Sequence, residues 1–170
     1  MIHGVNLKIG SFCVIDDGVV IGDNCTIMNY VELRKGTVIG DDCYIDSGVK
    51  SSGENRVGNR VTIRYDSILA KGVVLEDEVF ISPQFMSENL NHLREPVGGV
   101  YVERGVFIGT NVTTSAGIRI CEGAVIGTKA NVRKSITEAG VYVGNPARKR
   151  IIDPDSGRSY LIRERKEIEK

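Results

Sequence analysis

Aliphatic residues recur at every sixth position along two long blocks of this chain. The first row runs through Ile9, Ile15, Ile21, Ile27, Leu33, Ile39, Ile45, Ser51, Val57, Ile63, Leu69, Leu75 and Ile81, and only Ser51 is not aliphatic. The second row runs through Val102, Ile108, Thr114, Ile120, Ile126 and Val132. Four residues after most of these positions stands a small or β-branched residue, as at Cys25, Val31 and Val49. An amphipathic helix would need a period of 3.6 instead of six.

This period describes a chain that turns after every short strand. The aliphatic residue and the small residue two positions before it share parity along a strand, so both point inward and the residue between them points outward. Three six-residue sides make one coil, which buries its apolar row only when the next coil stacks on it through backbone hydrogen bonds. The 20 Gly residues suit many tight turns. The pattern therefore predicts a solenoid.

The repeat resembles that of the hexapeptide-repeat acyltransferases. The resemblance implies an all-β fold, a left-handed parallel β-helix with triangular 18-residue coils, which we assign to residues 1–137. The handedness rests on the resemblance alone, because the general rule for parallel crossovers favours right-handed connections. Members of that family are trimers with active sites between subunits. We therefore expect a homotrimer, and outward apolar rows such as Val20, Val38 and Val74 are the candidate contacts.

The repeat is interrupted once and then ends. The step from Ile81 to Val102 is not a multiple of six, so we predict a loop excursion at residues 84–101. Irregular segments on rigid scaffolds often carry function. This one contains His92, one of two His in the chain. Residues 138–170 are predicted to form a C-terminal segment with a Gly-Asn-Pro-Ala-Arg motif, a hairpin at IIDPDSGRSYLI and a charged tail.

The segment YVGNPARKR extends the resemblance from fold to coenzyme. It is similar to the signature that follows the last coil in members that use acetyl-CoA. By position, the resemblance implies that the pantetheine contacts Ala116, Gly117, Thr128 and Lys129, and that the phosphates contact Lys134, Arg148 and Lys149, with Asn145 and Pro146 from the motif. Fixed cations suit phosphates, and Arg can bind them through two hydrogen bonds. The alternative is that residues 148–150 are solvated surface charge.

The run VVLEDEVFISPQFMSENLNHLR is similar to bacterial N-acetyltransferases that act on the 3-amino group of nucleotide-linked amino sugars. Asn89 and Arg94 match the Asn and Arg of the loop in those enzymes, whereas Glu88 replaces a Thr and His92 begins a departure from Asn-Pro. The resemblance implies acetyl transfer from acetyl-CoA to a UDP- or dTDP-linked amino sugar in surface polysaccharide (O-antigen) biosynthesis. Glu88, Asn91 and Arg94 are then the residues expected to bind the sugar.

Two mechanisms stay open at this point. In one, His92 is a general base, which suits a saccharide O-acetyltransferase because a hydroxyl acceptor needs a base. In the other, Asn89 orients a sugar amine, a fraction of which is already neutral. In both, the backbone amide of Gly117 is the expected oxyanion donor. His92 as an ordinary loop histidine, and the chain as a non-enzymatic trimeric interaction module, are the alternatives.

Composition narrows the field further. The 22 basic residues balance the 22 acidic ones, so no net field attracts nucleic acid or an anionic membrane. No apolar run approaches the roughly 20 residues that span a bilayer, so we expect a cytoplasmic protein. Two His are too few for the three-His zinc site of γ-class carbonic anhydrases, and we expect no metal. Cys25 and Cys43 are expected to stack in neighbouring coils as reduced core residues.

Overall fold

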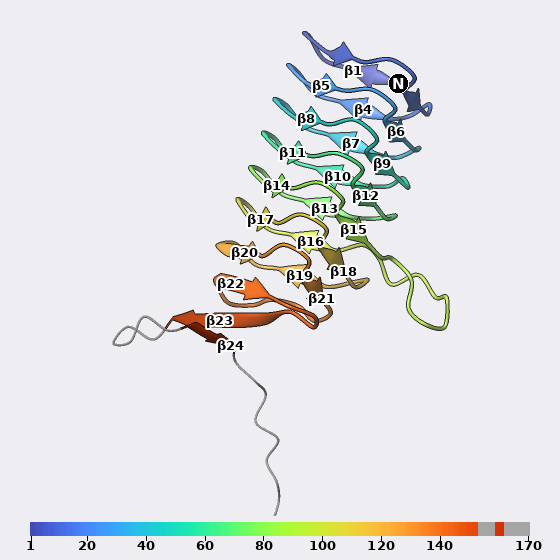
Figure 1. Ribbon diagram of the computed structural model, residues 1–170. Helices are drawn as coiled ribbons and strands as arrows, with labels where there is room; N and C mark the ends of the chain where they lie inside the picture. The colour runs from blue at the N-terminus through green and yellow to red at the C-terminus, as the bar shows by residue number, and fades with distance from the viewer. Residues whose placement is uncertain (153–158, 162–170) are drawn as a thin grey trace, which may run out of the picture.

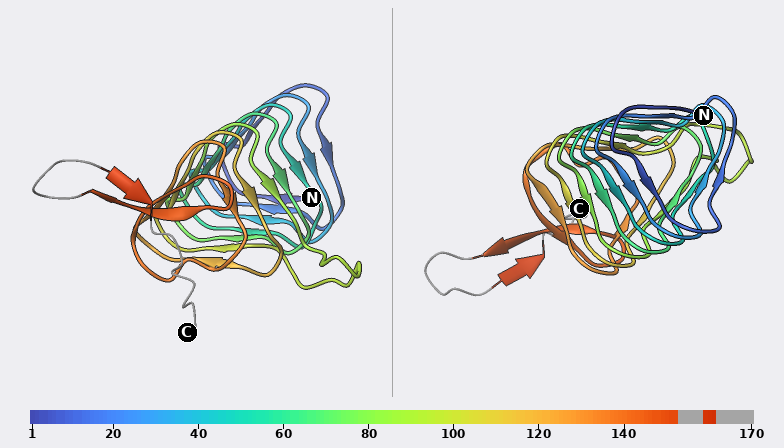
Figure 2. Two further views of the ribbon diagram at one scale, coloured as in Figure 1. Left: turned by 60° about the horizontal axis from the view of Figure 1, so that its bottom comes forward. Right: turned by 90° about the horizontal axis from the view of Figure 1, so that it is seen from above.

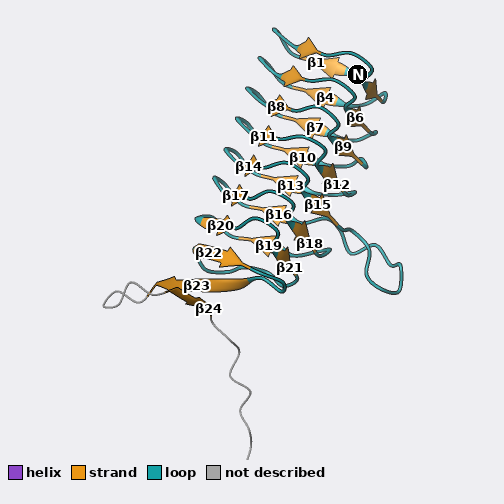
Figure 3. Cartoon of the chain, in the orientation of Figure 1, coloured by secondary structure: helices purple, strands orange, loops and turns teal. Residues whose placement is uncertain are grey.

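The computed structural model describes residues 1–152 and 159–161, and it shows a prism of stacked coils (Figure 1). The described residues contain strands and turns but no helix, as the colouring in Figure 3 makes clear. None of them forms a helix long and apolar enough to cross a membrane. Each coil contributes one short strand to each of three parallel sheets, which form the sides of the prism.

The three sheets list in the order in which their strands stack. Sheet A contains β1 (Ile2–His3), β4 (Val20–Ile21), β7 (Val38–Ile39), β10 (Arg56–Val57), β13 (Val74–Leu75), β16 (Tyr101–Val102) and β19 (Arg119–Ile120). Sheet B contains β2 (Lys8–Ile9), β5 (Thr26–Ile27), β8 (Tyr44–Ile45), β11 (Thr62–Ile63), β14 (Phe80–Ile81), β17 (Phe107–Ile108), β20 (Ala124–Ile126) and β22 (Gly140–Val143). Sheet C contains β3 (Val14–Ile15), β6 (Glu32–Leu33), β9 (Lys50–Ser51), β12 (Ile68–Leu69), β15 (Met86–Ser87), β18 (Thr113–Thr114) and β21 (Asn131–Val132).

Residues 18 positions apart pair in the ladders, as Ile27 does with Ile45. The backbone N–H of Thr26 donates to the carbonyl of Cys43 at 2.9 Å, and that of Met28 to Ile45 at 2.8 Å. The aliphatic row lies inside the prism, where Ile21, Ile27, Ile45, Ile63 and Ile81 are at most 1% exposed. The left-handed parallel β-helix predicted from the repeat is confirmed.

Ser51, the one break in the first aliphatic row, is buried without being left unsatisfied. Its hydroxyl lies 2.6 Å from that of Thr37 and accepts a hydrogen bond from the Asn55 amide at 2.8 Å. The Asn55 carbonyl oxygen in turn accepts from the backbone N–H of Val73 at 2.9 Å. Burying a polar group is costly unless it finds such partners. The coils therefore keep their register through this polar layer.

One corner of the prism explains why Gly follows so many of the aliphatic residues. At Gly22 a Cβ atom would lie 2.6 Å from the carbonyl carbon of Gly40, so only glycine allows the coils to approach this closely. Beside it, Asp23 donates its backbone N–H to the side chain of Asp41, and Asp41 donates likewise to Asn59, both at 2.8 Å. These side chains satisfy the turn amides that strand pairing leaves over.

Cys25 and Cys43 are free and stack inside neighbouring coils, as predicted. The Sγ atoms donate to the carbonyls of Gly40 and Gly58, both at 3.1 Å. Burial raises the pKa of the Cys25 thiol, and it raises the pKa of the Cys43 thiol to about 12. Both therefore serve as small core residues.

The loop excursion is shorter than the predicted 84–101. Phe85 is fully buried in the core, and Met86 remains in sheet C opposite Ile68. Val74 pairs with Tyr101, 27 positions later instead of 18, so nine residues are inserted between β15 and β16. The spacing prediction took Ile81 as the last residue in phase because Phe85 is large for a small slot and Ser87 is not aliphatic. Both side chains nevertheless point inward.

The C-terminal segment begins later than the predicted residue 138. Strand β22 still pairs in parallel with β20, with Val125 opposite Val141, so it adds one more side to the prism. The chain then reverses, and β23 (Arg148–Ile152) pairs antiparallel with β22 and with β24 (Ser159–Leu161). The turn between β23 and β24 and the charged tail lie outside the described residues.

Phe85 and Met86 provide a test of where the prism gives way to the loop. Phe85→Ala should lower the free energy of unfolding by about 3–5 kcal/mol, because it leaves a cavity in the core. Met86→Ala, at an outward position, should change it by less than about 0.5 kcal/mol. Urea denaturation measures both. Equally small effects would contradict the placement of Phe85 in the core.

Candidate functional site

The inserted loop leaves the prism at the corner between sheets C and A and folds back on itself. Leu90 bridges Pro96 in an antiparallel arrangement, and the backbone N–H of Val97 donates to the carbonyl of Asn89 at 3.0 Å. The loop projects well beyond the coils, on a different side of the prism from the β23–β24 hairpin (Figure 2). A rigid prism thus carries one projecting segment.

Asn91 holds the tip of this loop together. Its side-chain oxygen accepts hydrogen bonds from the backbone N–H groups of Leu93 at 2.9 Å and Glu95 at 3.0 Å. Its amide nitrogen donates to the Glu95 carboxylate at 2.8 Å. These bonds use the oxygen and one amide hydrogen of Asn91 within the loop. Its predicted role in binding a sugar is therefore at most secondary to its role in shaping the loop.

A pocket of about 330 Å³ lies between the loop and the prism. Glu88, Leu90, Asn91, His92 and Val97 line it from the loop, and Ser115, Ala116 and Arg133 line it from the coils. The structure thus brings together four predicted site residues: Glu88, Asn91, His92 and Ala116. Asn89, which is half-buried, and Arg94, which is exposed, lie in the same loop but are not among the lining residues.

Gly117 does not have the free amide that the predicted oxyanion role requires. Its N–H donates to the carbonyl of Gly98 at 2.9 Å, in a bond that ties the base of the loop to the next coil. The prediction was wrong on this point because the insertion brings Gly98 back into coil register. Ala116 is the neighbouring residue whose backbone borders the pocket.

A second pocket, of about 240 Å³, contains Arg133, Lys134, Pro146 and Arg148. The Gly-Asn-Pro-Ala-Arg motif forms one wall because it packs along β21. Asn131 donates its N–H to the carbonyl of Gly144 at 3.0 Å and accepts from the N–H of Ala147 at 2.8 Å. The Asn131 amide also donates to the side-chain oxygen of Asn145 at 3.2 Å. Three predicted phosphate-site residues therefore meet here.

Arg133 lines both pockets and was missed by sequence reasoning. It follows Val132, the last inward residue of the second row, so its side chain is directed to the corner where the loop lies. The signal was the basic pair Arg133–Lys134 directly after the last strand of sheet C. Only Lys134 was chosen, because the family resemblance singled it out. Arg133 connects the loop pocket to the basic pocket.

Lys149 does not join the basic pocket. It lies on β23 opposite Tyr142, and its Nζ atom forms an ion pair with the Glu138 carboxylate at 3.0 Å. The hydrogen bond to Glu138 raises the pKa of Lys149. The prediction was wrong because consecutive residues of a strand point to opposite faces, so Arg148 and Lys149 cannot both face one pocket.

Thr128 and Lys129 lie at the corner before β21, whereas Ala116 and Gly117 lie at the corner after β18. The two pairs therefore flank opposite edges of sheet C. The backbone N–H of Lys129 donates to the carbonyl of Thr110 at 2.9 Å. The structure does not gather these four residues into one contact surface.

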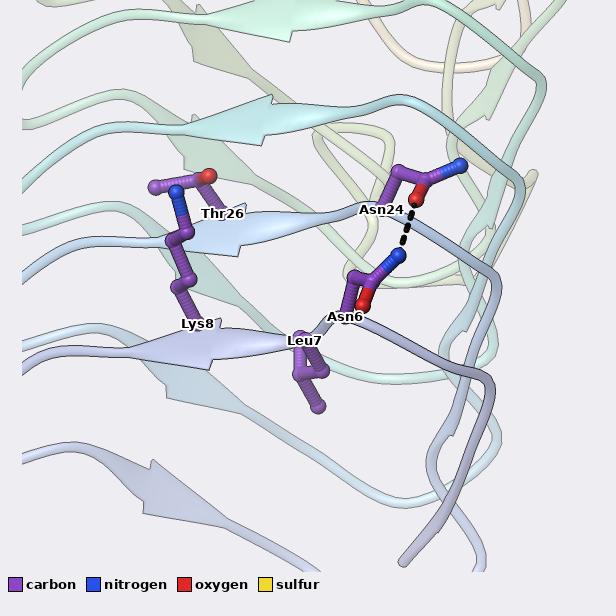
Figure 4. Close-up of a pocket in the computed structure, with 5 residues that line it drawn as sticks. All are labelled: Asn6, Leu7, Lys8, Asn24 and Thr26. Carbon is purple, nitrogen blue, oxygen red and sulfur yellow. Dashed lines mark hydrogen bonds between the residues drawn. The ribbon is translucent and has the colours of Figure 1, made fainter.

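Another hollow, of about 470 Å³, lies at the first coils (Figure 4). Asn6 donates to the side chain of Asn24 there at 3.0 Å, and Leu7, Lys8 and Thr26 complete the wall. These side chains supply amides, one ammonium group and a hydroxyl, but no histidine or carboxylate. Within residues 1–152 we also find no cluster of His, Cys, Asp and Glu that could hold a metal ion. The loop pocket is therefore the candidate site.

Two family models match the chain. One, described as the GMPPB C-terminal domain, matches residues 1–91, which is more than half of the chain. The other, described as the hexapeptide repeat of succinyl-transferase, matches residues 99–129. The gap between them falls in the loop. The predicted resemblance to hexapeptide-repeat proteins is confirmed.

Individual relatives match only in part. The bifunctional protein GlmU of Thermodesulfovibrio yellowstonii is 27% identical over 150 residues, which cover 85% of this chain and 27% of that protein. A chloramphenicol acetyltransferase of Agrobacterium fabrum is 36% identical over 76 residues, 44% of this chain and 35% of that protein. The chain thus spans about a third or less of the length of the curated relatives it matches.

Solved structures share the fold at low sequence identity. WeeI from Acinetobacter baumannii superposes with a TM-score of 0.55 and 22% identity, covering 79% of this chain and 56% of that one. The acetyltransferase domain of PglB from Neisseria gonorrhoeae gives a TM-score of 0.52 and 16% identity, covering 81% and 54%. At these identities the likeness establishes the architecture.

Proposed function

The chain belongs to the GMPPB C-terminal domain family, and from that premise we propose that it transfers an acetyl group from acetyl-CoA to a sugar amine, in particular that of a nucleotide-linked amino sugar. Family membership accounts for the prism but not for a reaction, because one fold hosts many functions. The observation that carries the proposal is the pair of pockets that share Arg133. The 36% identity to a chloramphenicol acetyltransferase supports acetyl transfer.

The basic pocket is the proposed site for the phosphates of acetyl-CoA. Lys134 and Arg148 lie there beside Pro146, at the wall that Asn145 helps to fix. Phosphate oxygens are bound best by fixed cations, and a guanidinium can engage two of them at once. The acetyl end then extends toward the loop pocket, past Ala116. Contacts of Thr128 and Lys129 with the pantetheine stay a prediction.

In the loop pocket the acceptor amine attacks the thioester carbonyl. The new bond joins nitrogen to the acetyl carbon, the carbon–sulfur bond breaks, and the proton lost from nitrogen accompanies the CoA thiolate. Asn89 and Arg94 are proposed to orient the sugar, together with Glu88. The developing oxyanion needs a fixed donor, and the backbone N–H of Ala116 is our candidate because that of Gly117 is already bonded to Gly98.

One observation favours a second reaction. His92 lines the loop pocket, within reach of an acceptor that binds there. A hydroxyl acceptor requires a general base, and His is the side chain best suited to that task near neutral pH. O-acetylation of a saccharide is therefore the alternative function.

We also propose that the active protein is a homotrimer. Outward apolar residues gather on sheet B, where the rings of Phe80 and Phe107 stack at 5.5 Å and Phe107, Val125 and Val141 are about 40% exposed. Exposed apolar rows of this kind mark interaction surfaces. A mass in solution three times that of the 18.6 kDa chain tests this. A role in surface polysaccharide biosynthesis and a cytoplasmic location stay predictions.

Acetyl-CoA binding tests the coenzyme site. Titration calorimetry should detect binding, and Arg148→Ala should weaken it by about 10- to 100-fold, the loss of one charge-assisted contact. Lys149→Met is the matched control and should change the Kd less than about threefold, because Lys149 faces Glu138 instead. No binding by the wild-type protein would favour a non-enzymatic interaction module. Equal losses in the two variants would contradict the basic pocket.

His92→Ala and Asn89→Ala separate the two reactions. With an amine acceptor, we expect Asn89→Ala to lower kcat by about 10-fold or more, while His92→Ala stays within about threefold of wild type. Steady-state kinetics on a panel of amino sugars and saccharides measures both. A loss of about 100-fold or more in His92→Ala, seen with a hydroxyl acceptor, would assign O-acetylation.

A further inference from the structure

We propose that Arg133 and Glu88 make the enzyme selective for amine acceptors that also carry an anionic group, with Arg133 binding the anion and Glu88 the ammonium group. This inference rests on the proposed function and specifies the substrate class of the same site. It adds two oppositely charged residues that the acetyl transfer itself does not require.

Arg133 differs from most arginines of the described chain. Within residues 1–152, no carboxylate lies within ion-pairing distance of its guanidinium group, which is exposed at the junction of the two pockets. Other arginines are held by carboxylates at 2.6 to 3.6 Å, namely Arg34, Arg60, Arg64, Arg104 and Arg119. The guanidinium of Arg133 is thus left to bind a ligand.

The charges that face the loop pocket are few. Glu88 is the only carboxylate among its lining residues, and Arg133 is the only Arg or Lys. The nearby Glu95 carboxylate is instead held by Asn91. Glu88 and Arg133 line the same pocket but do not form an ion pair with one another, so neither neutralises the other. Leu90 and Val97 supply apolar wall between them, which strengthens the attraction of each charge for a ligand.

An acceptor explains this arrangement better than the coenzyme does. The phosphates of acetyl-CoA have Lys134 and Arg148 in the basic pocket, whereas Arg133 is the only permanent cation that reaches the loop side. A sugar amine arrives mostly as an ammonium ion, which Glu88 attracts before the proton is lost. A guanidinium binds carboxylate or phosphate oxygens through two parallel bonds. The anion is then a carboxylate on the sugar or a phosphate attached to it.

The experiment compares kcat/KM for matched acceptors with an amino group at carbon 2 or 3: the free sugar, its 1-phosphate and its uronic acid. Wild type should favour at least one anionic form. Arg133→Met should reduce the anionic-to-neutral ratio of kcat/KM by about 10- to 100-fold, chiefly through KM. Arg133→Lys should restore part of it, and Lys149→Met should leave the ratio unchanged. Whether the phosphate or the carboxylate form loses more identifies the source of the anion.

Three results would overturn the inference, and they differ from a failure of the proposed function. Acetylation with no preference for anionic acceptors would refute it, as would an unchanged ratio in Arg133→Met. A loss of acetyl-CoA binding of 10-fold or more in Arg133→Met, measured by calorimetry, would assign Arg133 to the coenzyme. If wild type neither binds acetyl-CoA nor acetylates any acceptor, it is the proposed function that fails.

Discussion

Hydrogen bonding between stacked coils requires each strand residue to find its partner 18 positions further along the chain, and the rest of the molecule depends on that spacing. The requirement explains the inward aliphatic rows, the glycines at one corner and the side chains that satisfy turn amides between coils. Because each coil contacts only its neighbours, the constraint is local and repeats along the prism. Ser51 shows how strictly it holds: a polar residue in the row is given partners and the register does not shift.

The same constraint decides where a functional segment can be added. Nine residues inserted between β15 and β16 project outward, while the chain on both sides stays in register. The bond from Gly117 to Gly98 restores the ladder at the base of the loop. A mobile acceptor site is thereby fixed against rigid corners, and this places Glu88 and His92 opposite Ala116 and Arg133. Rigid support of this kind is what a site for acetyl transfer needs, because catalysis depends on alignment.

The sequence predicts the prism well because its period is enforced by backbone geometry at every coil. The loop limits were less predictable, since Phe85 and Ser87 occupy inward slots that their size or polarity disguises. Among the site residues, those in motifs were placed best: Lys134, Pro146 and Arg148 meet in one pocket. The errors at Gly117 and Lys149 have a common cause. Each depends on a partner distant in sequence, Gly98 or Glu138, and no local pattern reveals which donor is already engaged.

Deletion of residues 89–97 tests the central claim, that a rigid prism becomes a catalyst through its one insertion. The deletion removes nine residues and returns Tyr101 to an 18-residue spacing from Val74. Acetyl transfer, acetyl-CoA binding and thermal unfolding of the deletion variant are measured beside those of the full chain. The account predicts a folded prism that still binds acetyl-CoA but no longer acetylates any acceptor. Acetyl transfer at the rate of the full chain would contradict it.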